Sequence, residues 1–293
     1  MFTATLIAAN GLPAGEVSAA ADRLAAAGCR PSPPRWIDAD AAVDIDFTGD
    51  SLAARASLEG VFAGVDLVVQ PRAGRRKTLL IADMDSTMIT VECIDELADY
   101  AGIKAQVAEV TERAMRGELD FEGALDARVA LLAGLDEGAI YRCLAERVRI
   151  MPGAVPLVRT MRAHGALAVL VSGGFTRFAE PVATEIGFDR AIANRLLIAD
   201  GRLTGRVARP IVGAATKEAT LRAVIAERGL TPARTLAVGD GANDLPMIRA
   251  AGLGVAYHAK PIVAEAAAAR VQHGDLTTLL WAQGIPKAEW VTG

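Results

Sequence analysis

The sequence predicts an α/β protein with a Rossmann-like parallel sheet core, an inserted helical cap and an N-terminal ferredoxin-like α+β domain. After residue 76, short continuous apolar runs alternate with segments of helical apolar spacing, as in a parallel sheet covered by helices on both faces. A helical stretch at about 92–149 is too long for a simple crossover, so we interpret it as a cap. Residues 1–75 instead follow the order strand, helix, strand, strand, helix, strand, which is typical of a ferredoxin-like sandwich.

Length and composition agree with two such domains. The chain has 293 residues, of which 52% are hydrophobic and 23% are charged, which argues against a disordered chain. Its net charge of -4 is unlike that of nucleic-acid-binding proteins, which usually carry a basic face, so we expect no nucleic-acid partner. The three cysteines lack metal-ligand spacing, and neither a basic leader nor a membrane-spanning apolar run is present. We therefore expect a cytoplasmic protein with no membrane partner.

The elements of the N-terminal domain follow from local periodicity. Strands are expected at 3–9, in one or two pieces at 35–47, and at 65–70, and helices at 13–28 and 51–62. Ser51 is the candidate N-cap of the second helix. The basic segment PRAGRRK at 71–77 is interpreted as a solvated linker. The sheet has a free edge, which makes a homodimer possible, and whether this domain binds an amino acid or only mediates association stays open.

The elements of the second domain, 76–293, have a different pattern. Three apolar runs predict buried strands: KTLLIADMD at 77–85, ALAVLVSGG at 166–174 and RTLAVGDG at 234–241. Helical spacing occupies 155–165, 216–229 and 243–252. The segment 194–207 predicts a hairpin that turns at Asp200-Gly201.

Polar residues follow each of the three apolar strands. Asp83 and Asp85 end the first strand, Ser172-Gly173-Gly174 end the second, and Asp240 ends the third, with Asn243 and Asp244 close behind. Open parallel sheets bind ligands beyond the carboxyl ends of their strands, so we expect these groups to meet. A set of carboxylates without histidine or cysteine favours a hard cation, magnesium above zinc or copper.

Other residues point to an anionic substrate. Ser172 and the glycines after it offer a hydroxyl and open backbone N–H groups for phosphate, and Lys217 would neutralise negative charge beside it. The P-loop pattern of nucleotide-binding proteins is absent from the sequence. In the cap, Arg128 follows Phe121 by seven residues and shares the face of its apolar stripe. It is either a snorkelling arginine or a two-pronged clamp for a substrate carboxylate.

These segments resemble the motifs of a known superfamily. DMDSTMI (83–89), VSGGF (171–175), Lys217 and GDGANDLPMI (239–248) resemble the four motifs of the haloacid dehalogenase superfamily. With VECIDELA (91–98) and ANRL (193–196) added, the pattern is similar to that of the phosphoserine phosphatases, over roughly residues 77–280.

The resemblance implies a role for each matching residue. Asp83 would be the nucleophile and Asp85 the general acid and base. Magnesium would be held by Asp83, Asp240 and the backbone carbonyl of Asp85, with Asp244 supporting this shell. Phosphate would be bound by Ser172, Gly173, Lys217 and Asn243. The residues that would surround the rest of the substrate lie in the cap: Glu92, Met115, Phe121 and Arg128.

The resemblance also implies an activity. This is the hydrolysis of O-phospho-L-serine to L-serine and phosphate through an aspartyl-phosphate intermediate, the last step of serine biosynthesis. The alternative is a phosphotransferase, or a phosphatase of the same superfamily that acts on another small phosphorylated amino acid or alcohol. A binding or regulatory protein built on a degenerate scaffold is disfavoured, because every catalytic position carries a chemically competent residue. Selectivity for the L over the D enantiomer and feedback by serine stay open.

Overall fold

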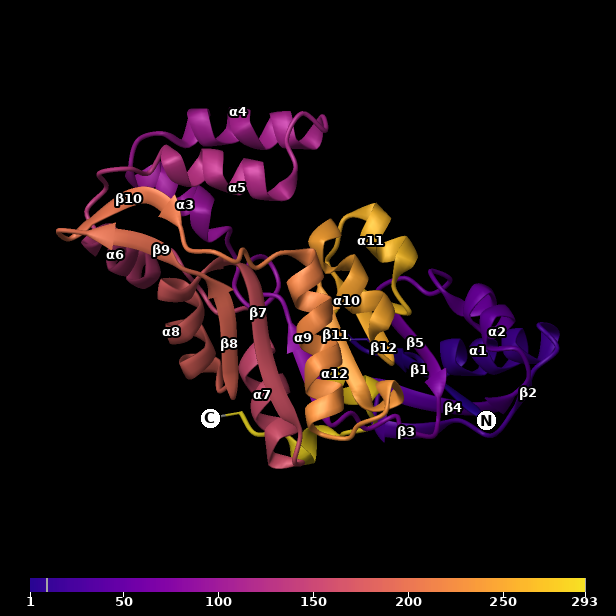
Figure 1. Cartoon of the computed structure of the whole chain (residues 1–293). Coiled ribbons are helices and arrows are strands. Elements are labelled where there is room, and N and C mark those ends of the chain that lie inside the picture. Colours follow the sequence, from indigo (N-terminus) through magenta and orange to yellow (C-terminus); the bar gives the residue numbers. More distant parts are fainter. Residues whose placement is uncertain (9, 293) are drawn as a thin grey trace.

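The computed structural model describes residues 1–8 and 10–292. Figure 1 shows three parts: a central parallel sheet with its helices, a helical cap over one edge of it, and a small N-terminal sheet with two helices on the other side. Among the described residues, no helix is both long and apolar enough to cross a membrane.

The central sheet has six parallel strands in the order β13-β12-β11-β6-β7-β8. These strands are β6 (Leu79–Ala82), β7 (Leu167–Phe175), β8 (Arg190–Asn194), β11 (Thr235–Gly239), β12 (Leu253–Tyr257) and β13 (Ala269–Val271). Every residue of β6 is buried, as its unbroken apolar run predicts for a strand covered on both faces. Asp83 directly follows β6, and its N–H donates to the carbonyl of Val238, 3.0 Å away.

Helices cover both faces of this sheet. One face packs against α7 (Ala154–Ala163), α8 (Thr176–Ile186) and α12 (Thr278–Ala282), and the other against α9 (Ala214–Glu227) and α10 (Leu245–Ala250). The short helix α11 (Pro261–Ala266) follows β12. The parallel sheet with helices on both faces, predicted from alternating apolar runs, is confirmed.

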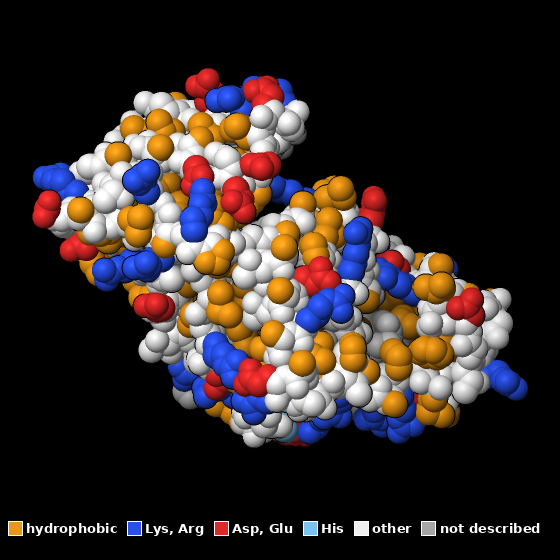
Figure 2. Space-filling model, in the orientation of Figure 1, with side chains coloured by type: hydrophobic (Ala, Val, Ile, Leu, Met, Phe, Trp, Pro, Cys, Tyr) orange, Lys and Arg blue, Asp and Glu red, His pale blue; other side chains and the backbone are white. Residues whose placement is uncertain are grey.

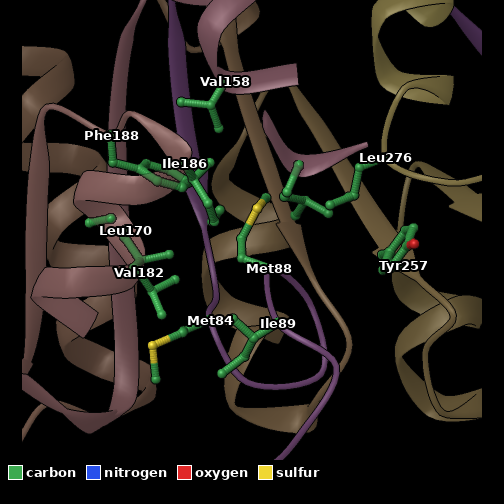
Figure 3. Packing of buried hydrophobic residues seen from close by; sticks show 14 of the residues in the cluster. Met84, Met88, Ile89, Val158, Leu170, Val182, Ile186, Phe188, Tyr257 and Leu276 are labelled. Atoms are coloured by element: carbon green, nitrogen blue, oxygen red, sulfur yellow. The ribbon is translucent and has the colours of Figure 1, made fainter. Parts of the chain in front are cut away.

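The loop after β6 is anchored in the larger core cluster. Met84, Met88 and Ile89 are fully buried there, and Figure 3 shows them among the core side chains. The loop closes as a turn in which the N–H groups of Met88 and Ile89 donate to the carbonyl of Met84, at 2.8 and 3.0 Å. Because Met84 packs into the core, the loop that carries its two neighbours, Asp83 and Asp85, is held in place.

The cap consists of four helices, α3 (Cys93–Tyr100), α4 (Lys104–Met115), α5 (Phe121–Ala130) and α6 (Gly138–Glu146). The hairpin of β9 (Leu196–Ala199) and β10 (Arg202–Val207) turns at Asp200 and Gly201. Both turn residues have positive φ, 51° and 71°, as a type I′ turn requires. The sequence did not indicate that this hairpin joins the cap, where Gly134 and Leu203 hydrogen-bond through a 2.8 Å contact.

The N-terminal sheet is antiparallel, with β1 (Phe2–Ile7) between β4 (Ala42–Thr48) and β5 (Asp66–Pro71), and with β2 (Arg30–Pro31) and β3 (Arg35–Asp38) beside β4. Helices α1 (Ala14–Ala26) and α2 (Ser51–Leu58) pack on one face. This is the strand order of the expected ferredoxin-like unit. The expected N-cap was off by one residue: the Asp50 carboxylate accepts the Leu52 N–H at 2.8 Å, and Ser51 is already helical.

The other face of the N-terminal sheet packs against the second domain, where β5 lies beside the edge strand β13 and β1 lies beside α12. The carboxylate of Asp66 accepts the N–H groups of Gln272 and Gly274, both at 2.8 Å. Arg75 pairs with Asp44 at 2.5 Å and is nearly buried, as is Lys77. The interpretation of 71–77 as a solvated linker was therefore wrong in part: Arg75 pairs with the buried Asp44, and the buried Lys77 donates to the carbonyls of Gly74 and Ala233.

Candidate active site

A buried cluster of three charged groups lies at the carboxyl edge of the central sheet. The ammonium nitrogen Nζ of Lys217, from α9, lies 2.6 Å from Oδ1 of Asp83 and 2.7 Å from Oδ1 of Asp244. Lys217 and Asp244 are completely buried, and Asp83 is almost so. The prediction that polar groups from different strand ends meet at one edge is thus correct for these residues.

Asp240 adds a third carboxylate to this edge. Asp83, Asp240 and Asp244 each offer an oxygen within 4.8 Å of the others. Burial, and then repulsion from Asp83, raises the pKa of Asp240 to about 6 and that of Asp244 to about 7. One lysine does not balance three close carboxylates, so the cluster fits a bound cation, and its all-oxygen donor set suits a hard divalent ion. The three carboxylates that lie together are those of Asp83, Asp240 and Asp244. The expected metal site also included Asp85, but through its backbone carbonyl and not through its side chain.

Asp85 has a different environment from Asp83. Its Oδ1 atom is buried and has no hydrogen-bond partner among the residues that the structure describes. Burial raises the pKa of Asp85 well above its usual range, and the carboxylates of Glu92 and Asp83 add to this effect. A raised pKa favours the protonated form of a carboxyl group, and that form can donate a proton. The two aspartates of the DxD pair are therefore set for different tasks.

The Ser172-Gly173-Gly174 segment, at the carboxyl end of β7, lies close to Asp85. A Cβ atom at Gly174 would lie only 2.9 Å from Oδ2 of Asp85, and one at Gly173 only 3.2 Å from the ring of Phe121. The hydroxyl of the buried Ser172 accepts the Gly174 N–H at 2.8 Å. Close approach requires a glycine at 174, since a side chain there would displace Asp85 and Ser172, whereas at Gly173 the ring of Phe121 would have to shift.

Asn194, at the end of β8, holds this end of β7 through side-chain hydrogen bonds. Its Nδ2 donates to the carbonyls of Gly173 and Val212, at 2.9 and 3.0 Å, and its Oδ1 accepts the Val212 N–H at 2.8 Å. Asn194 belongs to the ANRL segment (193–196), which implied no role for this side chain. Its position as a polar residue that ends an apolar strand was the available signal.

Two hydroxyl groups donate hydrogen bonds to acidic residues of the site, and neither was expected from the sequence. Thr87 donates to Oδ1 of Asp240 at 3.1 Å, and Ser86 donates to Oε1 of Glu92 at 2.7 Å. Ser86 has a φ of 56°, in the left-handed region that serine rarely adopts. Both residues belong to the DMDST loop, so proximity to the two aspartates was the signal that could have found them.

The cap brings a cation and an anion to the cleft. Arg128 is half-buried, and the only hydrogen bond of its guanidinium within the described residues is a 3.3 Å contact from Nε to the carbonyl of Ala124. Burial lowers its pKa, while Asp95, Glu92 and Asp85 oppose this effect. Glu92 lies at the exposed mouth of the cleft, and partial desolvation there raises its pKa. Figure 2 shows the hollow where the cap overhangs the core.

The remaining predicted site residues lie as follows. Phe121 begins α5, and its ring reaches across to the core. A Cβ atom added to Gly213 would lie 3.1 Å from this ring. Asn243 lies in the 3-10 turn after β11, and its Oδ1 folds over Gly241 at 2.4 Å from the Cβ position there. Met115 ends α4, but its side chain lies outside the described part of the structure. Phe121 and Gly173 are therefore in contact, and Asn243 lies beside the acidic cluster.

The chain is similar to known proteins over most of its length. Residues 80–249 match the family of haloacid dehalogenase-like hydrolases. A phosphoserine phosphatase from Streptomyces coelicolor is 47% identical over 82% of this chain and 59% of that protein. One from Albidiferax ferrireducens is 47% identical over 69% of this chain and 87% of that protein. The crystal structure of a probable phosphoserine phosphatase from Vibrio cholerae, in unliganded form, has a TM-score of 0.76 and 33% identity, over 96% of this chain and 88% of that one.

The coverage of the relatives is uneven. The aligned part of the chain spans 59%, 55% and 63% of three curated relatives, but 87% of the relative from Albidiferax ferrireducens. The family match extends over more than half of the chain and contains the strand ends that carry Asp83, Ser172 and Asp240. On these grounds the chain belongs to the haloacid dehalogenase-like hydrolases, a family whose phosphatases use a divalent metal ion.

Proposed function

We propose that this protein is a phosphoserine phosphatase that hydrolyses O-phospho-L-serine to L-serine and phosphate, the last step of serine biosynthesis. The observation that carries the proposal is the division of the cleft into two halves. The core half holds the Asp83, Lys217 and Asp244 cluster. The cap half holds Arg128, which has no ion-pair partner among the described residues, and Glu92. Phosphoserine carries the complementary groups: a phosphate, a carboxylate and an ammonium.

In the first half-reaction, a carboxylate oxygen of Asp83 attacks phosphorus and displaces the serine oxygen. The new Asp83–phosphorus bond forms as the bond from phosphorus to the serine oxygen breaks. Asp85, whose protonated form is favoured because burial raises its pKa, gives a proton to the leaving oxygen. Lys217 stays beside Asp83 and offsets the charge on the transferred group.

In the second half-reaction, water replaces the aspartate on phosphorus. Asp85 is now ionised and accepts a proton from the water as it attacks. The bond from phosphorus to Asp83 breaks, and phosphate leaves with Asp83 restored as a carboxylate. Asp85 thus serves first as acid and then as base. This agrees with its place beside the end of β7, where a Cβ atom added to Gly174 would lie 2.9 Å from Oδ2 of Asp85.

Magnesium is the metal that we propose for the acidic cluster. Asp83, Asp240 and the backbone carbonyl of Asp85 would hold it, and Asp244 would support this set from its contact with Lys217. When bound, magnesium would neutralise charge on the phosphoryl oxygens. Burial raises the pKa values of Asp240 and Asp244, and repulsion from Asp83 adds to this effect. A cation beside these carboxylates would favour their ionised forms.

The substrate's amino-acid part would be read by the cap. The fork of Arg128 fits a carboxylate through two parallel hydrogen bonds, and Glu92 would meet the ammonium. Met115 and Phe121 would line the pocket, and Ser172, Gly173, Lys217 and Asn243 would surround the phosphate. The ring of Phe121 already lies over Gly173, so substrate would be enclosed between cap and core.

The remaining assignments are also proposals. We place the domain boundary between residues 75 and 76, with the N-terminal ferredoxin-like unit in a regulatory or associating role. A homodimer through the N-terminal sheet and a cytoplasmic location complete the proposed description.

The test of the function is a panel of phosphorylated amino acids, alcohols and sugars assayed with magnesium. We expect phosphoserine to have the highest kcat/KM and free phosphate to equal serine in amount. A phosphate group recovered on an added alcohol, such as homoserine, would indicate a phosphotransferase instead. Equal rates on phosphoserine and on an alkyl phosphate without the amino-acid group would contradict the substrate assignment.

A further inference from the structure

A second polar cavity lies at the opposite edge of the central sheet from the active site. It has a volume of about 90 Å³ and is lined in part by Arg76, Lys77, Thr78, His164 and Arg234. Thr78 and Arg234 immediately precede β6 and β11, and Asp83 and Asp240 immediately follow these strands. The cavity and the catalytic aspartates thus lie at opposite ends of the same two strands.

The cavity gathers basic groups in an otherwise acidic protein. Its charged lining residues are Arg76, Lys77 and Arg234, and His164 lies beside Arg76. None of the described residues that line the cavity is an Asp or a Glu. The nearest carboxylate partner is Glu289, which lies 3.3 Å from both Arg76 and His164. Arg75 adds no free charge, because it is paired with Asp44. Glu289 is a single, partly exposed carboxylate and does not balance the three cations, so the cavity keeps a positive charge.

Several of these groups retain unused hydrogen-bonding capacity. Lys77 is nearly buried, and its Nζ donates to the carbonyls of Gly74 and Ala233 at 3.0 and 2.9 Å, which leaves one of its three protons. Arg234 forms no side-chain hydrogen bond or ion pair within the described part of the chain. The hydroxyl of Thr78 is buried and likewise has no partner there.

The proximity of these cations affects the pKa of Lys77. Burial lowers the pKa of Lys77 to about 8, and Arg234 and Arg75 contribute to this effect by repulsion. A buried ammonium next to an unpaired guanidinium is unfavourable unless an anion joins them. The site therefore has the charge, the donors and the enclosure that an anion needs.

We propose that this cavity binds a small tetrahedral oxyanion of the phosphate or sulfate class. The volume corresponds to about three water molecules, which admits such an ion and excludes a nucleotide. Arg234 supplies paired N–H donors, and Lys77 supplies its remaining proton. The inference does not depend on the proposed function, since none of these residues belongs to the catalytic cleft.

The local probe for this site is His164. The protein has only three histidines, and His164 alone among them lines this cavity. The imidazole C–H signals of His164, assigned with His164→Gln, are followed by NMR while phosphate or sulfate replaces chloride at constant ionic strength and pH. EDTA is present throughout, so that the metal-dependent catalytic site does not contribute. We expect a saturable shift of the His164 signal and none for His258 or His273.

Two variants and a matched control make the result decisive. Arg234→Gln should weaken the affinity read at His164 by about tenfold or more, because a charged donor pair is lost. Lys77→Met should do the same, but it also removes two structural hydrogen bonds, so its folding is checked by its melting temperature. Arg222→Gln, on the exposed side of α9, should bind like the parent.

The outcomes separate the possibilities. Saturation by phosphate alone, by sulfate alone or by both identifies which oxyanion the site accepts, and each supports the proposal. A His164 signal that drifts without saturating, or an affinity in Arg234→Gln equal to that of the parent, overturns it. Loss of phosphoserine hydrolysis has no bearing on this result, since the readout is binding at the opposite edge of the sheet.

Discussion

The ammonium group of Lys217 and the carboxylate of Asp83 form a fully enclosed ion pair, with Nζ 2.6 Å from Oδ1. The same Nζ binds Asp244 at 2.7 Å. Burial alone would lower the pKa of Lys217, but the two carboxylates raise it above its ordinary value. Lys217 is therefore charged near neutral pH, and it holds Asp83 through this ion pair.

Asp83→Asn should abolish turnover, because an amide cannot attack phosphorus. The fold should survive, since the amide keeps the side chain's shape and Lys217 retains its contact with Asp244. The measurements are phosphate release from phosphoserine and the melting temperature. Asp22→Asn, at an exposed position of α1, is the control and should keep full activity. Partial activity in Asp83→Asn would remove this residue from the nucleophile role.

Asp85→Asn should slow both half-reactions by roughly 10²–10⁴-fold, the usual effect of losing a general acid or base. An aryl phosphate, whose leaving group needs no proton, should still phosphorylate Asp83, and the aspartyl-phosphate should accumulate. Mass spectrometry of the denatured protein would detect the added phosphoryl group. Turnover of phosphoserine at the parent rate would mean that another group supplies the proton.

The metal-free protein should lose stability as pH rises from about 4 to about 7. The pKa values of Asp240 and Asp244 are about 6 and about 7 in the folded state and 3.8 ordinarily, so the folded state binds more protons across this window. For Asp240 the loss is roughly 3 kcal/mol, since each pKa unit corresponds to about 1.4 kcal/mol. Thermal unfolding in EDTA at several pH values measures it.

Magnesium should remove this dependence, because a bound cation stabilises the ionised carboxylates. Asp240→Asn is the matched variant: in EDTA it should be more stable than the parent at pH 8 and similar to it at pH 4. A parent protein whose stability in EDTA rises through this pH window would show that the acidic cluster is already balanced without a metal.

Arg128→Lys should separate substrate recognition from chemistry. Lysine keeps the charge but lacks the planar fork, so kcat/KM for phosphoserine should fall by roughly 10²-fold or more. Hydrolysis of an aryl phosphate without a carboxylate should fall far less, because Asp83, Asp85 and Lys217 are unchanged. Arg142→Lys, at an exposed position of α6 in the same cap, is the control. Parallel losses on both substrates would assign Arg128 a structural role.

Much of the fold could be predicted from the sequence because its strands are short and wholly apolar. Leu79–Ala82 is buried on both faces, and such a run has few alternatives once helical segments flank it. Strands β8, β12 and β13 were not predicted. Arg190–Asn194 begins with an exposed arginine and is half-buried, and Ala269–Val271 has only three residues, so neither contains a pattern long enough to separate strand from loop.

Site residues could be predicted where a chemically suitable side chain directly follows a strand. Contacts that depend on how helices and loops pack together could not. Asp83 and Asp240 directly follow apolar strands, so their meeting at one edge follows from topology. The buried contact of Lys217 with Asp244 depends on how α9 and the loop after β11 pack, which no local pattern records. The support of Gly173 by Asn194 likewise joins residues that are 21 positions apart through a side chain.

The cap is assembled from two separate stretches of chain, the helices at 93–146 and the hairpin at 196–207. Gly134 and Leu135 share backbone hydrogen bonds with Leu203, and a Cβ atom at Gly205 would lie 2.9 Å from that of Ala133. Recombination that exchanged only the helical insertion would pair it with a foreign hairpin across this seam. New specificities in this lineage are thus expected to arise by point substitution within the cap, or by paired exchanges, more readily than by transplanting a single gene segment.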